Sequence, residues 1–219
     1  AHEINPWMPS NEKLNALSAR ETLIADVPVL VHEATQTDKA KKLFDLASIP
    51  FPEQPYTYKN KEDYNAILKQ WGDEKKEVVL QYIHGKKTID RDAYWMDAKL
   101  LNYLNSKAYL REIVPEKYVP EREVIDSKDL EKALEHWELP FVLKPGDETR
   151  TAGGYGVQIC HTEEQLAEAK KLFTQEGADH VIIEKYVKEI ENYSCQYAYS
   201  ENIGLQYLGT SVQITDDEG

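Results

Sequence analysis

The chain has 219 residues, enough to bury a hydrophobic core in one large domain or two small ones. Its net charge of −13 argues against sequence-independent binding of nucleic acid or anionic lipid, because both need a positive surface. Two cysteines are too few for a disulfide framework, and no apolar run approaches the roughly 18 residues of a membrane span. A cytoplasmic protein is expected.

The first half of the chain alternates short apolar runs with helical patterns. Residues 27–31 and 78–83 are β-branched runs typical of buried strands. Between them, Thr37 is positioned to cap a helix with one apolar face, and a second helix is predicted over 62–71. Alternating strands and helices predict a parallel sheet, so an α/β domain is expected here.

The second half begins with a longer helical pattern over 94–113, interrupted at Asn105-Ser106-Lys107. Ser127 is positioned to cap a further helix, and Thr162 to Gln165 forms a capping box before another. The remaining apolar or alternating runs predict strands, the last two of them antiparallel, at 141–145, 157–159, 181–187, 193–199 and 205–214. Pro115 and Pro120 bracket a loop before Val124-Ile125.

Residues 141–157 hold the most informative pattern in the chain. An apolar strand ends in Lys144-Pro145, and a polar loop leads from there to Gly153-Gly154-Tyr155-Gly156. Backbone amides of such a loop can approach an anion, because glycine carries no Cβ, and a preceding lysine adds a charge suited to phosphate. Taken alone, the pattern also fits a β-hairpin whose glycines only form the turn.

Four pieces in this order resemble the ATP-grasp superfamily. They are residues 105–112, 140–145, 153–156 and 181–187, with helices between them. The resemblance covers roughly the second half of the chain. The first half is similar to the α/β domain that precedes the core in these enzymes, although it carries no motif.

The resemblance implies how the chain is divided. Residues 1–92 would form the pre-ATP-grasp parallel α/β domain, and 93–219 the ATP-grasp region. Within that region, an α+β lid subdomain with antiparallel strands is expected at about 120–187, and the C-terminal subdomain would begin at 188–219.

The resemblance places the catalytic residues beyond this sequence. In the family, the Mg²⁺ ligands and the arginine that steadies the acyl-phosphate follow the strands with which this chain closes, so they are expected downstream of Gly219. The acidic residues 216–218 are interpreted as a solvated turn and not as metal ligands. We therefore expect an incomplete ATP-grasp core that binds nucleotide weakly by itself and does not turn over.

The resemblance also implies where ATP phosphates would bind. Lys107 and Lys144 occupy the positions of the two phosphate-contacting lysines. Gly153, Gly154, Tyr155 and Gly156 would form the mobile loop over the triphosphate, which must close to exclude water. The structural alternatives are a solvated lysine at a helix end for Lys107 and a tyrosine that only packs within the loop.

The remaining contacts of the nucleotide are expected just after the strand at 181–187. Glu184-Lys185-Tyr186-Val187 resembles the hinge that holds adenine. The backbone of Lys185 and Val187 would pair with the adenine edge, and Glu184 would accept from its exocyclic amine. Glu191, or its neighbour Asn192, would bind the ribose hydroxyls. The alternative for the hinge is a plain edge strand with a solvated charge pair.

The implied function is an ATP-dependent carboxylate–amine ligase of the amino-acid or peptide type. A carboxylate would attack the γ-phosphate to give an acyl-phosphate, and an amine would then displace phosphate. The expected cofactors are ATP and Mg²⁺, and a homodimer is an open expectation. Two alternatives remain: a biotin carboxylase-like enzyme, disfavoured by the single Gly-Gly pair, and a non-catalytic nucleotide-binding or interaction module.

Overall fold

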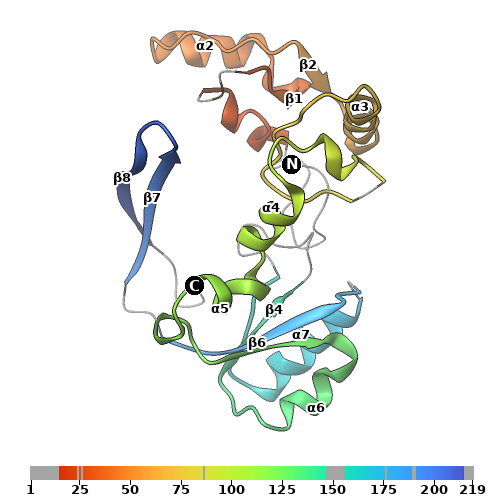
Figure 1. Cartoon of the computed structure of the whole chain (residues 1–219), viewed down its shortest axis with the longest axis vertical. Coiled ribbons are helices and arrows are strands. Elements are labelled where there is room, and N and C mark those ends of the chain that lie inside the picture. Colours follow the sequence, from red (N-terminus) through yellow and green to blue (C-terminus); the bar gives the residue numbers. More distant parts are fainter. Residues whose placement is uncertain are drawn as a thin grey trace.

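The computed structural model describes residues 15–214, apart from positions 24, 26, 86, 147–155, 176, 189 and 190. The described chain forms an N-terminal α/β part, a four-stranded sheet with helices, and a two-stranded hairpin (Figure 1). Parallel pairing precedes antiparallel pairing, as the predicted mixed α/β class requires.

The N-terminal part is built on two short parallel strands and the helices around them. Strand β1 pairs with β2 in parallel, with Leu30 opposite Tyr56. Helix α3 packs on them through Tyr64 and Leu68, and α4 adds Ala98 and Leu101 to the same core. The elements are η1 Arg20–Leu23, β1 Leu30–His32, η2 Glu33–Thr35, α2 Asp38–Leu46, β2 Tyr56–Tyr58, α3 Lys61–Asp73, η3 Arg91–Ala93 and α4 Ala98–Asn105.

The strand predicted over 78–83 is largely wrong. Only Val78 pairs, in an isolated parallel bridge with Tyr94. The amide of Val78 donates to the carbonyl of Ala93 at 2.8 Å, while the neighbouring Val79 is 65% exposed. The run therefore passes along the core with its ends buried and forms no ladder. Conversely, the three-residue strand β2 is too short to give a sequence signal.

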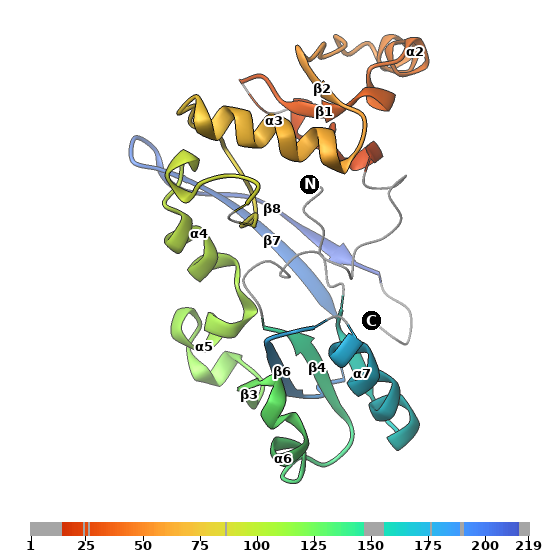
Figure 2. The ribbon, with the colours of Figure 1, turned by 90° about the vertical axis from the view of Figure 1, so that its right-hand side faces the viewer.

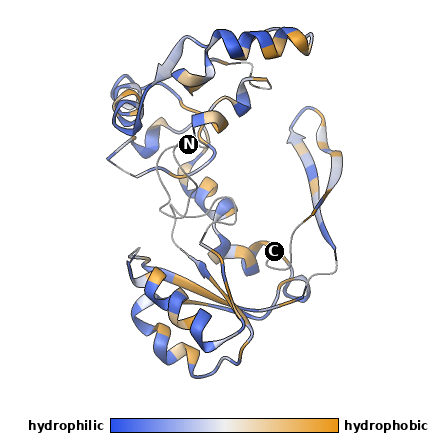
Figure 3. Cartoon of the chain, turned by 180° about the vertical axis from the view of Figure 1, so that it is seen from behind, coloured by the Kyte–Doolittle hydropathy of each residue, from blue (hydrophilic) through white to orange (hydrophobic). Residues whose placement is uncertain are grey.

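The expectation about the apolar face of the helix after Thr37 also needs correction. Thr37 does cap α2, since its Oγ1 accepts from the amide of Ala40 at 3.2 Å. The apolar face of α2 is nevertheless not buried, and Leu46 is 83% exposed. Trp95, whose large aromatic ring favours a core position, is 63% exposed. Figure 3 shows the apolar residues of α2 at the outer end of the molecule.

The central unit is an antiparallel sheet with the strand order β3-β6-β4-β5. Helices α6 and α7 pack against this sheet (Figure 2). The elements are η4 Lys107–Tyr109, α5 Leu110–Ile113, η5 Glu116–Tyr118, β3 Arg122–Asp126, η6 Ser127–Asp129, α6 Leu130–Leu134, β4 Phe141–Pro145, β5 Gln158–Cys160, α7 Glu163–Gln175 and β6 His180–Lys185.

One face of this sheet forms the second hydrophobic core. Alternate residues of β4 and β6, such as Leu143 and Ile183, point to this face and are fully buried. Helix α7 covers them with Ala169 and Phe173, and α6 contributes Leu130. Since successive strand residues point to opposite faces, Lys144 of β4 and Glu184 of β6 lie on the other side.

The helix starts around this core are only partly as predicted. The capping box of α7 is confirmed, because Thr162 Oγ1 accepts from the amide of Gln165 at 3.3 Å and Gln165 Oε1 accepts from that of Thr162 at 3.2 Å. Ser127 does not cap a helix. Its hydroxyl donates instead to the carbonyl of Ala178, which fixes the turn after β3 to the chain before β6.

The C-terminal hairpin consists of β7 Asn192–Ser200 and β8 Gly204–Gln213, antiparallel as predicted, with an irregularity between Gln196 and Tyr197. It projects beside the rest of the chain (Figure 1). Large apolar side chains are exposed along it, for example Tyr199 at 72% and Leu208 at 66%. Among the described residues, no helix is both long and apolar enough to cross a membrane.

The second core predicts a strong contrast between two leucine substitutions. Leu143→Ala removes a fully buried side chain and should lower the free energy of unfolding by about 2–5 kcal/mol. Leu205→Ala, at a residue that is 66% exposed, should change it by less than about 0.5 kcal/mol. Urea denaturation of both variants measures the difference, and equal losses would contradict the assignment of the core.

Candidate functional site

The sheet face opposite α6 and α7 carries three charged side chains close together. Arg122 stands opposite Glu184 in the register of β3 and β6, and Lys144 stands opposite Ile182 in that of β4 and β6. Directly opposed residues share a face, as do residues two apart on one strand. The register therefore places Arg122, Lys144 and Glu184 on the same face.

Both carboxylate oxygens of Glu184 are paired. Oε1 forms an ion pair with Lys144 Nζ, and Oε2 lies 3.3 Å from Arg122 Nη1. The exposed fractions are 2% for the Arg122 side chain, 9% for Glu184 and 20% for Lys144. Removing such charges from water is costly, so each needs its partner.

Lys107 joins this group through the backbone and through its charge. Arg122 Nη2 donates to the carbonyl oxygen of Lys107 at 2.6 Å. Burial lowers the pKa of the Lys107 ammonium, and the nearby positive charges of Lys144 and Arg122 lower it further, while Glu184 opposes the shift. We call Lys107, Arg122, Lys144 and Glu184 the charge cluster.

The segment that carries Lys107 is fixed on both sides. Ser106 Oγ accepts from the amide of Ala108 at 3.2 Å, which starts the short helix η4. Asn105 Nδ2 donates to the carbonyl of Gln81 in the N-terminal part at 3.1 Å. The interruption of the helical pattern at Asn105-Ser106-Lys107 thus marks the joint at which Lys107 meets the sheet.

The charge cluster is suited to a polyanion. Among the described residues, Lys107, Lys144 and Arg122 lie near the carboxylate of Glu184, in a chain whose net charge is −13. A bound anion would relieve the repulsion among Lys107, Lys144 and Arg122, and each contact would be a charge-assisted hydrogen bond. Lysine and arginine arranged in this way are typical of phosphate sites.

Gly153, Gly154 and Tyr155 of the predicted phosphate loop lie outside the described residues. Gly156 is described, and its φ of +81° is one that other residues adopt only with strain. At the other end, the amide of Gly146 donates to the carbonyl of His180 at 3.0 Å, and a Cβ at Gly146 would lie 3.2 Å from His180 Cβ. A side chain at position 146 would therefore need His180 to shift by a few tenths of an ångström where the loop begins.

The predicted hinge follows β6 directly. The amide of Lys185 donates to the carbonyl of Glu121 at 2.8 Å, so any adenine contact there is left to the Lys185 carbonyl and the Val187 amide. Tyr186 packs edge-to-face on His161, with the ring centroids 4.8 Å apart. Val187 is 60% exposed.

Glu191, the predicted ribose ligand, follows all members of the charge cluster in the sequence. Its carboxylate accepts from the hydroxyl of Tyr193 at 2.5 Å, which raises the pKa of that phenol. The rival Asn192 begins strand β7. No contact in the described part of the chain ties Glu191 to Lys107 or Lys144, so its role stays a prediction.

The catalytic residues are not assigned to any position of this chain. The described residues end at Ile214, so Gly219 and the acidic residues 216–218 before it lie outside them. The expectation that the catalytic residues and the Mg²⁺ ligands follow downstream of Gly219 stays a prediction.

Sequence reasoning missed Arg122, the residue that contacts both Lys107 and Glu184. It belongs to no motif, and an arginine at the start of a strand is ordinarily solvated. The signal that could have found it is the register of β3 against β6, which is not readable from one strand alone.

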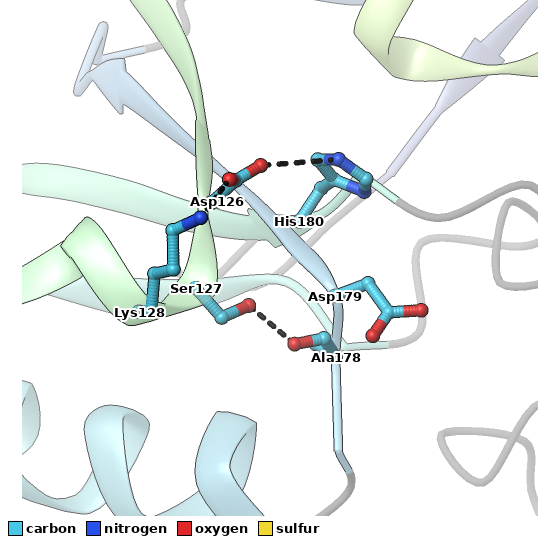
Figure 4. A pocket seen from close by; sticks show the side chains of 6 residues that line it. All are labelled: Asp126, Ser127, Lys128, Ala178, Asp179 and His180. Carbon is cyan, nitrogen blue, oxygen red and sulfur yellow. Dashed lines mark hydrogen bonds and ion pairs between the residues drawn. The ribbon is translucent and has the colours of Figure 1, made fainter.

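A second group of polar side chains lies on the surface beside Ala178 and Asp179 (Figure 4). Asp126 lies between Lys128 Nζ at 2.8 Å and His180 Nε2 at 3.4 Å. All three side chains are about half exposed or more, so these pairs are weak. Across the described ranges, no three His, Cys, Asp or Glu side chains are grouped to hold a metal ion.

Two protein-family models match the chain. Residues 1–102 match the "L-aspartate--L-methionine ligase N-terminal domain", and residues 120–219 match "L-aspartate--L-methionine ligase, ATP grasp". The chain therefore belongs to the ATP-grasp superfamily, with an N-terminal domain before the ATP-grasp part. This confirms the resemblance predicted from the sequence.

Two solved structures are compared with the chain, and the first of them shows the same fold. N5-carboxyaminoimidazole synthetase from Staphylococcus aureus, complexed with ADP, is 17% identical with a TM-score of 0.50; the match covers 75% of this chain and 45% of that one. D-alanine–D-alanine ligase from Helicobacter pylori is 13% identical with a TM-score of 0.48, over 94% of this chain and 71% of that one. The chain thus spans less than half of the first of these enzymes.

The charge cluster predicts opposite changes in the pKa of Lys107. Lys144→Met removes a neighbouring cation and frees Glu184, so the Lys107 pKa should rise. Glu184→Gln removes the carboxylate that opposes the lowering of this pKa, so the pKa should fall further. NMR titration of isotope-labelled, methylated lysines measures both shifts.

Lys128→Met serves as the control for this titration, because the Lys128 side chain is 75% exposed and pairs with Asp126. It should leave the Lys107 pKa unchanged. Shifts of the same sign in Lys144→Met and Glu184→Gln would contradict the proximity of these groups.

Proposed function

We propose that the full-length protein is an ATP-dependent ligase that joins the carboxylate of one amino acid to the amine of another. The observation that carries the proposal is the charge cluster, which brings Lys107 and Lys144 together on the sheet face opposite α6 and α7. The names of both matching family models support L-aspartate and L-methionine as the two substrates.

In this proposal, Lys107 and Lys144 bind the phosphates of ATP. Each ammonium group is partly withdrawn from water, so an arriving phosphate replaces little hydration and gains a charge-assisted hydrogen bond. The predicted loop from Gly153 to Gly156 would close over the triphosphate. Glycine at position 156 supports this role, since its backbone has a positive φ.

Adenine would lie at the hinge after β6. The Lys185 carbonyl and the Val187 amide remain for its edge, because the Lys185 amide already donates to Glu121. Glu184 would accept from the exocyclic amine with a lone pair that Lys144 and Arg122 leave unused. Glu191 is proposed for the ribose hydroxyls.

The reaction proposed has two steps. A carboxylate oxygen attacks the γ-phosphorus of ATP, which forms an acyl-phosphate and releases ADP. The amine nitrogen of the second amino acid then attacks the acyl carbon, the C–N bond forms, and phosphate leaves with the bond between the acyl carbon and its oxygen broken. The residues of this chain contribute positioning and charge neutralisation, which is most of what phosphoryl transfer requires.

Mg²⁺ would bind together with ATP, because ligases of this superfamily use both ATP and Mg²⁺. The described residues offer no carboxylate cluster for it, so the roles assigned to this chain do not pass through the metal. A cytoplasmic location is proposed because the reaction consumes ATP. The net charge of −13 supports small-molecule substrates over nucleic acid. A homodimer stays a prediction.

Nucleotide binding is tested by thermal stabilisation of the full-length protein. ATP at about 100 times its Kd should stabilise the protein by about 2.7 kcal/mol, and Lys144→Ala should remove most of this shift. Lys128→Ala, which removes an exposed lysine just after β3, should keep it. An equal shift in Lys144→Ala and the wild type would exclude Lys144 from the site.

Ligase activity is tested by phosphate release and by the mass of the product. With ATP and Mg²⁺, L-aspartate and L-methionine together should give phosphate and a product of their combined mass less one water. Either amino acid alone should give no such product. ATP-dependent stabilisation without any product would instead favour the non-catalytic nucleotide-binding module.

A further inference from the structure

Arg122 contacts two other members of the charge cluster, Lys107 and Glu184. Its Nη2 donates to the carbonyl of Lys107 at 2.6 Å, and its Nη1 lies 3.3 Å from Glu184 Oε2. The side chain is 2% exposed, so it reaches no ligand in solution directly. Its two nitrogens act in different directions, on a backbone carbonyl and on a carboxylate.

Nucleotide binding creates an electrostatic problem at Glu184. In the present arrangement, Lys144 is paired with Glu184 Oε1. When Lys144 turns toward phosphate, the carboxylate loses part of its compensation while its side chain is only 9% exposed. A buried carboxylate without a partner is strongly unfavourable, and this cost would be subtracted from the binding free energy.

We propose that Arg122 is a positioning residue that retains Glu184 while Lys144 is transferred to the phosphates, and that it holds the Lys107 segment in place during this exchange. The proposal rests on the proposed nucleotide site. Arg122 keeps its contact with Oε2 when Oε1 is vacated, so Glu184 stays paired in both states. The same guanidinium fixes the backbone of Lys107 relative to the sheet.

Arginine suits this role better than lysine for a geometric reason. The planar guanidinium presents five donors in a fixed fork, so two acceptors at different angles can be held at once. An ammonium on a flexible stem can pair with Glu184 or reach the Lys107 carbonyl, but it does not fix both. Arg122→Lys therefore keeps the charge and removes the bridge.

The test compares ligands that differ in phosphate content. The Kd values of adenosine and ADP are measured by titration for the full-length wild type and Arg122→Lys. The ADP Kd should rise about tenfold, equivalent to about 1.4 kcal/mol, while the adenosine Kd stays within about twofold. A uniform loss for both ligands, or no loss for ADP, would overturn the proposal.

Arg91→Lys is the matched control. Arg91 Nη1 also donates to a backbone carbonyl, that of His84 at 2.5 Å, but it does so in the N-terminal part. Both variants remove one arginine fork, so both should lower thermal stability. Only Arg122→Lys should change the ratio of the adenosine and ADP affinities, and the same change in Arg91→Lys would overturn the assignment.

Glu184→Gln provides the second variant and keeps the proposal testable if Arg122→Lys does not fold. Without the carboxylate, Lys144 has no partner to leave, so ADP should gain affinity relative to adenosine. In this background, the increase in the ADP Kd caused by Arg122→Lys should be about five times smaller than in the wild type. No gain in Glu184→Gln, or identical costs in both backgrounds, would contradict the exchange of partners.

The outcomes separate this inference from the proposed function. A wild type that binds neither adenosine nor ADP would refute the nucleotide site, and the role of Arg122 with it. A wild type that binds ADP, with an unchanged ADP-to-adenosine ratio in Arg122→Lys, would refute the role of Arg122 alone.

Discussion

The paired carboxylate of Glu184 is the interaction on which the arrangement of the site depends. It draws together β3, β4 and β6, because its two oxygens bind Arg122 and Lys144 from the neighbouring strands. Through Arg122 it also reaches the backbone of Lys107, on the segment that enters from the N-terminal part. Because these charges are largely buried, removing one member of the cluster would leave another without its partner.

The two faces of the central sheet have different roles. Leu143, Val181 and Ile183 hold the sheet on α6 and α7, and the register they impose decides which residues appear on the opposite face. A slip of one residue in β6 would send Glu184 into the hydrophobic core. The core therefore stabilises the fold, and the register that it imposes places the charged residues on the opposite face of the sheet. In the proposed reaction these residues need no nucleophile among them, because phosphoryl transfer relies on placement of charge.

The sequence predicted the parts of this structure that are encoded locally. The strand Phe141–Pro145 carries its own apolar pattern, and the capping box at Thr162 carries its own hydrogen bonds. Lys144 was predicted to bind ATP phosphate because a glycine-rich loop follows it; in the structure it pairs with Glu184, and the phosphate role stays a prediction. Gly156, which belongs to the predicted phosphate loop, has a positive φ.

What the sequence did not reveal depends on residues far apart in the chain. The β-branched run at 78–83 has strand propensity, but β1 and β2 are three residues each and offer it no long partner. The apolar face of α2 predicted burial, whereas tertiary packing leaves it exposed. The place of Arg122 in the site depends on its contacts with Lys107, 15 residues earlier, and with its strand partner Glu184.

Protection of individual lysines from chemical modification tests the central claim most directly. The full-length protein would be treated with an amine-acylating reagent, with and without ATP, and the modification of each lysine measured by mass spectrometry. The account predicts that ATP slows the modification of Lys107 and Lys144 and leaves the exposed Lys128 unaffected. Unchanged modification of Lys107 and Lys144 at saturating ATP would contradict it.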